Sequence, residues 1–274
     1  MFIDSHAHLN FNAYKKDLDK VIKRALEEGV WIINVGSKYD NSKKAVEIAK
    51  KYEKGVYAAV GLHPIHLSEG IFKLKKDPHE QEEKDTTADD FDIEKYKELA
   101  KSEKVVAIGE IGLDYYYRPK TKTRMELLKS RQKEFFIKQL DIAKELNLPV
   151  IFHCRMAHQD MIDILGFQTS FRGVMHCFTG TLEDAKKYLE MGFYIGLNGI
   201  IFKLDLDKTI KEIPLEKILI ETDCPYLTPP EEEKKRNEPL FVKYIAQKIA
   251  KIKNIDYSKV VNDTTDNARK LFGI

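Results

Sequence analysis

The sequence predicts one α/β domain over residues 1-274, a (β/α)8 barrel that is either regular or distorted. Short apolar runs, about eight in number, alternate with amphipathic stretches. Strands that are apolar throughout and separated by helices indicate a parallel sheet covered on both faces. The chain length suits one large barrel domain. A doubly wound open sheet has the same alternation and stays the alternative.

Each expected strand is a short apolar run, often rich in β-branched residues. Between the strands, apolar residues recur at three- and four-residue spacing, which predicts helices at 18-28 and 131-146. The segment 68-92 is highly charged and without periodicity, so we expect a surface excursion there. The expected strands are 2-4, 30-35, 56-60, 105-109, 150-153, 173-176, 193-197 and 218-221.

The composition limits the class of protein. The 46 basic and 44 acidic residues give a net charge of +2, which excludes a strongly basic duplex-binding protein but not a local basic rim. No apolar run could span a bilayer, and the first residues lack the pattern of a signal peptide. Three cysteines, an odd and low count, fit a reducing compartment. We therefore expect a cytoplasmic protein that does not bind membranes.

Two histidines follow the first expected strand. His6 and His8 are two residues apart, so on an extended strand their side chains project to one face. Two imidazoles on one face can bind a metal ion, although the pair alone is weak evidence. The pattern recurs at four further strand ends, with Glu110, His153, His176 and Asp223.

The strand ends of a barrel converge on one face, so these six side chains should meet. Six ligands exceed the need of one tetrahedral ion and suit two divalent ions that share a carboxylate, roughly 3.5–4 Å apart. Nitrogen and oxygen donors accommodate zinc or manganese, and magnesium less readily. Such a pair activates a water and polarises the bond that it cleaves, so the sequence predicts a hydrolase.

The three cysteines each follow an expected ligand directly. Cys154, Cys177 and Cys224 come after His153, His176 and Asp223. Adjacent residues of an extended strand face opposite ways, so the thiols should point toward the helices and pack as small buried side chains.

These residues lie in motifs that resemble the TatD family of metal-dependent deoxyribonucleases, TIM barrels of the amidohydrolase-like superfamily. The likeness covers essentially the whole chain, in family order. The matching segments are FIDSHAHLNF, GLHP, AIGEIGLDYYY, LPVIFHCRMAHQD, GVMHCFTGT, IGLNGIIFK, ILIETDCPYLTP, RNEP and TTDNARKLFG.

The resemblance implies a role for each ligand. His6, His8 and Asp223 would hold one ion, His153 and His176 the other, and Glu110 would bridge them. Asp223 would also orient the attacking water or accept its proton, so Asp223 and Glu110 are the expected catalytic residues. The family activity implies hydrolysis of DNA from the 3′ end, on single strands or exposed 3′ ends, without an obligate protein partner.

Three further residues are candidate substrate contacts. His63 ends the third expected strand and could contact a phosphate, or have a structural role only. Arg155 could clamp a phosphate through its fork of donors, or form a salt bridge within the rim. Arg236 could reach the phosphate, or anchor its own loop.

The acidic part of the 68-92 segment departs from the family pattern. It follows a strand and so belongs to the catalytic face, where it would repel a polyanion if held near the site. This keeps a second substrate class open: an ester or amide, as in a D-aminoacyl-tRNA deacylase or a hydrolase of small cyclic amides. A third hypothesis is a non-enzymatic barrel that binds a partner and keeps metal only for stability. The acidic residues are Glu80, Glu82, Glu83, Asp85, Asp89 and Asp90.

Overall fold

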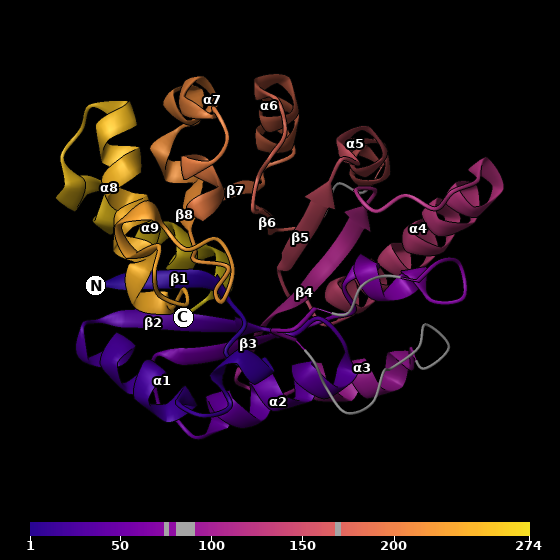
Figure 1. The fold of residues 1–274 in the computed structure, drawn as a ribbon, viewed down its shortest axis with the longest axis horizontal. Helices are drawn as coiled ribbons and strands as arrows, with labels where there is room; N and C mark the ends of the chain where they lie inside the picture. Colours follow the sequence, from indigo (N-terminus) through magenta and orange to yellow (C-terminus); the bar gives the residue numbers. More distant parts are fainter. Residues whose placement is uncertain (74–76, 81–90, 168–170) are drawn as a thin grey trace.

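The computed structural model describes residues 1–73, 77–80, 91–167 and 171–274. Its centre is one sheet of eight parallel strands whose spatial order follows the chain, with the helices around the outside (Figure 1). The predicted barrel is confirmed. The strands are β1 Phe2–Ala7, β2 Val30–Val35, β3 Val56–Val60, β4 Val105–Asp114, β5 Val150–Arg155, β6 Gly173–His176, β7 Tyr194–Leu197 and β8 Ile218–Ile220.

The residues that follow β8 close the sheet onto β1. Asp223 N donates to His6 O at 2.9 Å, and His8 N donates to Cys224 O at 2.8 Å. The buried Asp4 carboxylate accepts hydrogen bonds from the backbone N and the hydroxyl of Thr222, at 2.9 and 2.6 Å. An open doubly wound sheet would leave these edges apart, so the alternative topology is excluded.

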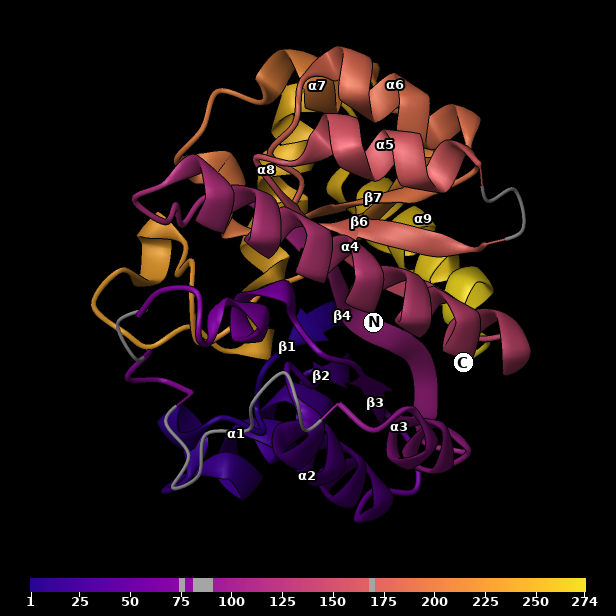
Figure 2. The same ribbon diagram turned by 90° about the vertical axis from the view of Figure 1, so that its right-hand side faces the viewer.

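The helices alternate with the strands and cover the barrel on its outer side (Figures 1 and 2). The helix expected at 18-28 is α1, and the one expected at 131-146 is the second half of the longer α4. The first half of α4 was missed because it is largely exposed, as Leu127 is, and so lacks apolar periodicity. The helices are α1 Leu18–Glu27, α2 Tyr39–Lys50, α3 Ile93–Ala100, α4 Lys122–Glu145, α5 His158–Gly166, α6 Leu182–Glu190, α7 Asp207–Glu212, α8 Val242–Lys253 and α9 Tyr257–Phe272.

The last helix, α9, packs across the end of the barrel where the strands begin. Thr265 Oγ1 donates to Met1 O at 3.0 Å, and Asn267 Nδ2 donates to Ile218 O at 2.9 Å. Its residues Leu271 and Phe272 share a buried cluster with alternate residues of the strands. Because this end is filled by apolar packing, the opposite end, where the strands finish, is the one available for a site. Among the described residues, no helix has the length and apolar character that crossing a bilayer requires.

Candidate metal centre

Six side chains from five strands converge at the carboxyl end of the barrel. His6 Nε2 and His8 Nε2 lie 3.1 Å apart. His6 Nε2 is 3.3 Å from Glu110 Oε2, and His8 Nε2 is 3.4 Å from Asp223 Oδ1. His176 Nε2 lies 3.6 Å from Glu110 Oε1 and 3.8 Å from Asp223 Oδ1. The ring of His176 stacks on that of His6 with centroids 3.5 Å apart.

Contacts outside the cluster fix which nitrogen two of the histidines turn inward. His8 Nδ1 lies 2.9 Å from Val35 O, which can only accept, so Nδ1 carries the proton and Nε2 offers a lone pair. His176 Nδ1 lies 2.7 Å from the buried Glu221 Oε1, so Nε2 is the nitrogen that faces the cluster. Metal-binding histidines in general hold their outer nitrogen in this way.

Glu110 lies at the centre of the cluster. Its Oε2 faces His6, and its Oε1 lies 2.5 Å from His153 Nδ1. The other nitrogen of His153, Nε2, lies 3.3 Å from Asp114 Oδ2. The two oxygens of Glu110 therefore face two different groups of histidines, as a bridging carboxylate would.

The sequence did not predict that two further carboxylates at this end of the barrel would contact the histidines of the cluster. Glu221 is fully buried behind His176, where its Oε1 also accepts from Cys177 N and Asn198 Nδ2. Asp114 contacts His153 because β4 runs five residues further than expected. The signal for Glu221 was present: it is a carboxylate that directly follows the apolar strand Ile218–Ile220.

The electrostatics of the cluster follow from burial and mutual contact. Burial alone would raise the pKa of Glu110, but the nearby histidines, His63 and His176 foremost, hold it well below its ordinary value. Burial lowers the pKa of His176, but Glu221 and Glu110 outweigh it and raise that pKa to about 10. Burial and the neighbouring His176 lower the pKa of His6 to about 4. The carboxylates thus stay ionised and require positive charge beside them.

One cysteine departs from the expected orientation. Cys177 has a left-handed backbone, with φ of 45°, which ends the strand alternation after His176. Its sulfur lies within 4.8 Å of ligand atoms of His176 and Asp223, and the residue lines the cavity over the cluster. The prediction that this thiol points away was therefore wrong. Cys224 is fully buried, as expected.

Cys154 packs mainly behind the site. Its thiol lies 3.4 Å from His158 Nδ1 and 3.9 Å from the Tyr188 hydroxyl. Burial raises its pKa to about 12, so it carries no thiolate at neutral pH.

A cavity of about 300 Å³ opens over the cluster, and two of the candidate substrate contacts line it. His63 Nδ1 accepts from Ile65 N at 3.0 Å, so its Nε2, 3.5 Å from Glu110 Oε1, is the nitrogen that donates. Arg155 stacks its guanidinium 3.5 Å from the ring centre of Tyr116. Within the described part of the chain Arg155 forms no ion pair, so its donors stay available to an anion.

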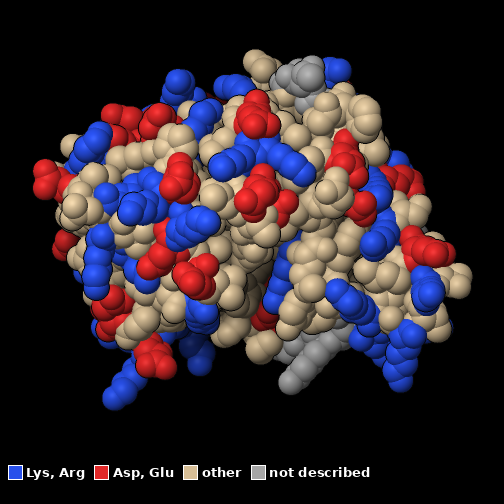
Figure 3. All heavy atoms as spheres, turned by 90° about the horizontal axis from the view of Figure 1, so that it is seen from above, with Lys and Arg blue, Asp and Glu red and all other residues tan. Residues whose placement is uncertain are grey.

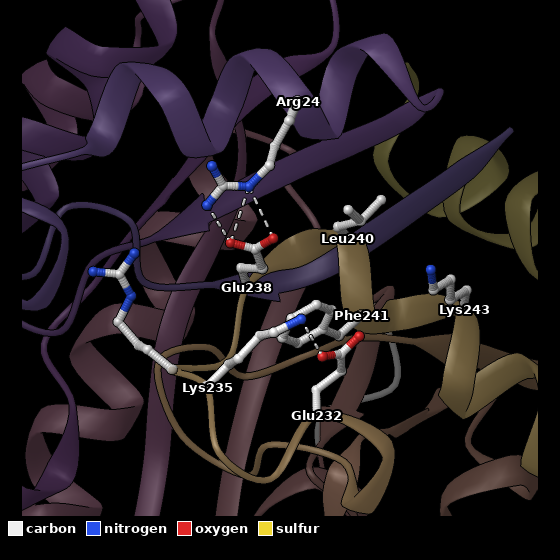
Figure 4. Close-up of a pocket in the computed structure, with 8 residues that line it drawn as sticks. Arg24, Glu232, Lys235, Glu238, Leu240, Phe241 and Lys243 are labelled. Atoms are coloured by element: carbon white, nitrogen blue, oxygen red, sulfur yellow. Dashed lines mark hydrogen bonds and ion pairs between the residues drawn. The ribbon is translucent and has the colours of Figure 1, made fainter.

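The third candidate substrate contact, Arg236, does not line this cavity. Its guanidinium binds both carboxylate oxygens of Asp17, at 2.8 and 3.1 Å, and lies 4.1 Å from the ring centre of Tyr14. It belongs to a second, charged pocket in which the neighbouring ions are paired, Arg24 with Glu238 and Lys235 with Glu232 (Figure 4). These contacts favour the loop-anchoring role.

Arg236→Ala should therefore destabilise the protein and leave substrate binding unchanged. We expect a loss of about 1–2 kcal/mol at neutral pH in urea unfolding, from the ion pair and the stacking on Tyr14. The hydrogen bond from Arg236 lowers the pKa of Asp17, so the ion-pair part is present above the ordinary carboxyl pKa, about 4, and is lost as the pH falls below it. A raised KM with unchanged stability would contradict this role.

Described residues of the 68-92 segment reach the mouth of the cavity. Glu80 lies 3.1 Å from His66 Nε2 and 3.0 Å from Asn41 Nδ2, and Asp77 accepts from the Tyr226 hydroxyl at 2.9 Å. Asp77 and Glu80 both line the cavity. The other acidic residues named for this segment, Glu82, Glu83, Asp85, Asp89 and Asp90, lie outside the described residues.

Comparison with known proteins agrees with this geometry. The family model described as "TatD related DNase" matches residues 3–273. The chain belongs to the TatD family. It is 40% identical to "Uncharacterized metal-dependent hydrolase YabD" of Bacillus subtilis, over 100% of both chains. It is 33% identical to "3'-5' ssDNA/RNA exonuclease TatD" of Escherichia fergusonii, over 99% of this chain and 98% of that protein.

Solved structures of TatD proteins share the whole fold. The TatD homolog YJJV of Escherichia coli superposes with a TM-score of 0.82 at 26% identity, over 100% of this chain and 98% of that one. A TatD family hydrolase of Entamoeba histolytica gives 0.78 at 27% identity, over 99% and 97%. This TatD-family chain is thus a metal-dependent hydrolase, and the residue clusters above are its candidate metal ligands.

Proposed function

We propose that this protein hydrolyses phosphodiester bonds of single-stranded DNA from the 3′ end, with two divalent ions in the cluster. The observation that carries the proposal is the arrangement around Glu110, whose two oxygens face separate groups of histidines. Relatives that carry the name of a 3′-5′ exonuclease acting on single-stranded DNA and RNA give it further support.

The donor set fits two divalent cations. His8 and His176 turn Nε2 inward, and the two ionised carboxylates Glu110 and Asp223 lie between the rings. His6 Nε2 is close enough to His8 Nε2 that a shared cation would relieve the contact between two nitrogen acceptors. His6, His8 and Asp223 would hold one ion, His153 and His176 the other, and Glu110 both. Zinc or manganese suits these donors better than magnesium.

When bound, the ions supply a water nucleophile at neutral pH and offset the charge of the phosphoryl group. Asp223 can accept the proton of that water, because its side chain, 14% exposed, reaches the cavity further than that of Glu110, 4% exposed. His63 donates from Nε2 and Arg155 from its guanidinium, so both can bind the non-bridging phosphate oxygens. Glu221 holds His176 in place from behind.

The direct test is cleavage of a 5′-labelled single-stranded oligodeoxynucleotide. Protein stripped with a chelator and then loaded with zinc, manganese or magnesium should shorten the strand stepwise from its 3′ end, and the stripped protein should not. An oligonucleotide blocked at the 3′ end should resist. Cleavage of neither substrate with any ion, beside an active control nuclease, would refute the proposal.

A second candidate is hydrolysis of an ester or amide in a small substrate or an aminoacyl-tRNA. Asp77 and Glu80 favour it, because two carboxylates on the cavity wall disfavour a polyanion on that side. A panel of lactones, cyclic amides and D-aminoacyl-tRNA, run beside the oligonucleotide with the same loaded protein, separates the two. Turnover of an ester or amide far above that of DNA would favour the second candidate.

A further inference from the structure

A surface beside the cavity combines exposed aromatic rings with exposed cations. We propose that this surface, the aromatic–basic rim, binds the strand of single-stranded nucleic acid that leads to the scissile bond. The inference rests on the proposed function and adds the path and the side from which the strand enters. The rim consists of Tyr116, Tyr117, Arg118, Lys120, Lys122 and Arg124, between β4 and the first turn of α4.

Three consecutive tyrosines are divided between the core and the rim. Tyr115 continues the sheet, donating its N–H to Arg155 O at 2.9 Å, and is 4% exposed, with its hydroxyl bonded to Asp160. The Asp114 carboxylate then accepts from Tyr116 N at 2.9 Å and turns the chain outward. Tyr116 is 49% and Tyr117 40% exposed, with their rings perpendicular and 5.1 Å apart. Large exposed rings at one place indicate a binding surface.

The rim is continuous with the catalytic cavity. Arg155 lines the cavity, and its guanidinium lies 3.5 Å from the ring centre of Tyr116 and 5.9 Å from that of Tyr117. Asp114, which turns the chain outward, contacts His153 of the metal cluster with its other oxygen. A phosphate held at Arg155 would therefore place the next base along the strand beside the exposed tyrosines.

The positive charge of the rim indicates a polyanion as its partner. The run 115-124 reads YYYRPKTKTR, with four cations and no acidic residue. All four cations are exposed, and in the described part of the chain none of them forms an ion pair. On most of the face drawn in Figure 3, by contrast, positive and negative side chains are interspersed. Aromatic rings among exposed cations are the combination that binds single strands, by stacking bases and by contacting phosphates.

The acidic residues at the mouth of the cavity determine the side from which the strand enters. Asp77 and Glu80 line the same cavity as Arg155 but come from the segment after β3. A polyanion is repelled from this wall and attracted to the rim. The two effects together admit the strand over Tyr116 and Tyr117, so that only its end needs to enter the cavity.

The test compares binding with cleavage. Binding of labelled oligothymidylate, and of oligouridylate as the RNA arm, is measured by fluorescence anisotropy with the wild type and with Tyr117→Ala, Tyr116→Ala and the double variant. Each removed stacking contact should weaken binding about 5- to 150-fold. Tyr117→Phe keeps the ring and should restore binding. Tyr257→Ala, at an exposed tyrosine of α9, is the matched control.

Kinetics separate substrate binding from a structural role. Tyr117→Ala should raise KM for the oligonucleotide, leave kcat unchanged and leave hydrolysis of a small aryl phosphodiester unchanged, because that substrate does not reach the rim. Equal losses on both substrates would mean that the tyrosines only support Arg155, and would overturn the proposal. So would unchanged oligonucleotide binding in the double variant.

Salt dependence tests the cations. For a single strand, each lost phosphate contact reduces the slope of log K against log salt by about 0.7. This slope should be smaller for the double variant with Lys120→Ala and Lys122→Ala. It should be unchanged for the control double variant with Lys208→Ala and Lys251→Ala, at exposed lysines of α7 and α8. Binding through the rim without any cleavage would refute the proposed function and support the rim. If the wild type cleaves the oligonucleotide but the rim variants bind it as tightly as the wild type does, the proposed function is supported and the rim proposal is refuted.

Discussion

Asp223→Asn should lower kcat/KM for the oligonucleotide by about 10³-fold or more. The change removes a negative charge from the cluster and the group that can accept the proton of water, which together are worth several kcal/mol. Its carboxylate contacts His6, His8 and His176, so the amide should also weaken metal retention. The measurements are steady-state cleavage and the metal content after dialysis.

Glu110→Gln should have an effect of the same size, for a different reason. Glu110 faces both groups of histidines, so its loss should reduce the bound metal from two ions to one or none. Asp205→Asn and Glu126→Gln make the same chemical changes at exposed positions and should behave as the wild type. Full activity of either site variant with its metal lost would show that metal serves stability alone.

Glu221→Gln should lower metal affinity about 10- to 100-fold, the usual cost of losing the partner behind a metal-binding histidine. The amide keeps an acceptor for Cys177 N and Asn198 Nδ2 but loses the charge that holds His176 Nδ1, 2.7 Å away. Gly196 leaves the room for this carboxylate, since a Cβ there would lie 2.8 Å from Glu221 Oε2. Chelator competition measures the affinity.

A matched pair of variants distinguishes orientation from packing. Glu221→Ala removes the charge and also leaves the three donors around Oε1 without this partner, so it should destabilise the fold as well, by about 2–4 kcal/mol. If Glu221→Gln keeps the wild-type metal affinity and loses stability instead, then Glu221 braces the strand ends and does not orient His176.

The strands were predictable from the sequence because each is an apolar run that the barrel buries on both sides. Runs such as 30-35, 56-60 and 173-176 have the predicted bounds. The end of β4 was not predictable in this way, since Glu110 and Gly112 interrupt the apolar run before the strand ends at Asp114. The first half of α4 was missed because an exposed helix need not show an apolar stripe.

The metal cluster was predictable for a related reason. A histidine or carboxylate at the end of an apolar strand is visible in the sequence, and the barrel topology sends every such end to one face. His6, His8, Glu110, His153, His176 and Asp223 do converge there. Cys177 was not predictable, because its left-handed backbone ends the alternation on which the expectation rested.

The sequence alone therefore determined the family, the barrel and the residues that could bind metal, because these depend on residue type and on the periodicity of strands and helices. Only the tertiary structure decided that Arg236 pairs with Asp17 away from the cavity, that Glu221 lies behind His176, and that Tyr116 packs against Arg155 at the cavity mouth. Each of these contacts joins residues from different parts of the chain, and local pattern carries no information about which distant partner a side chain meets.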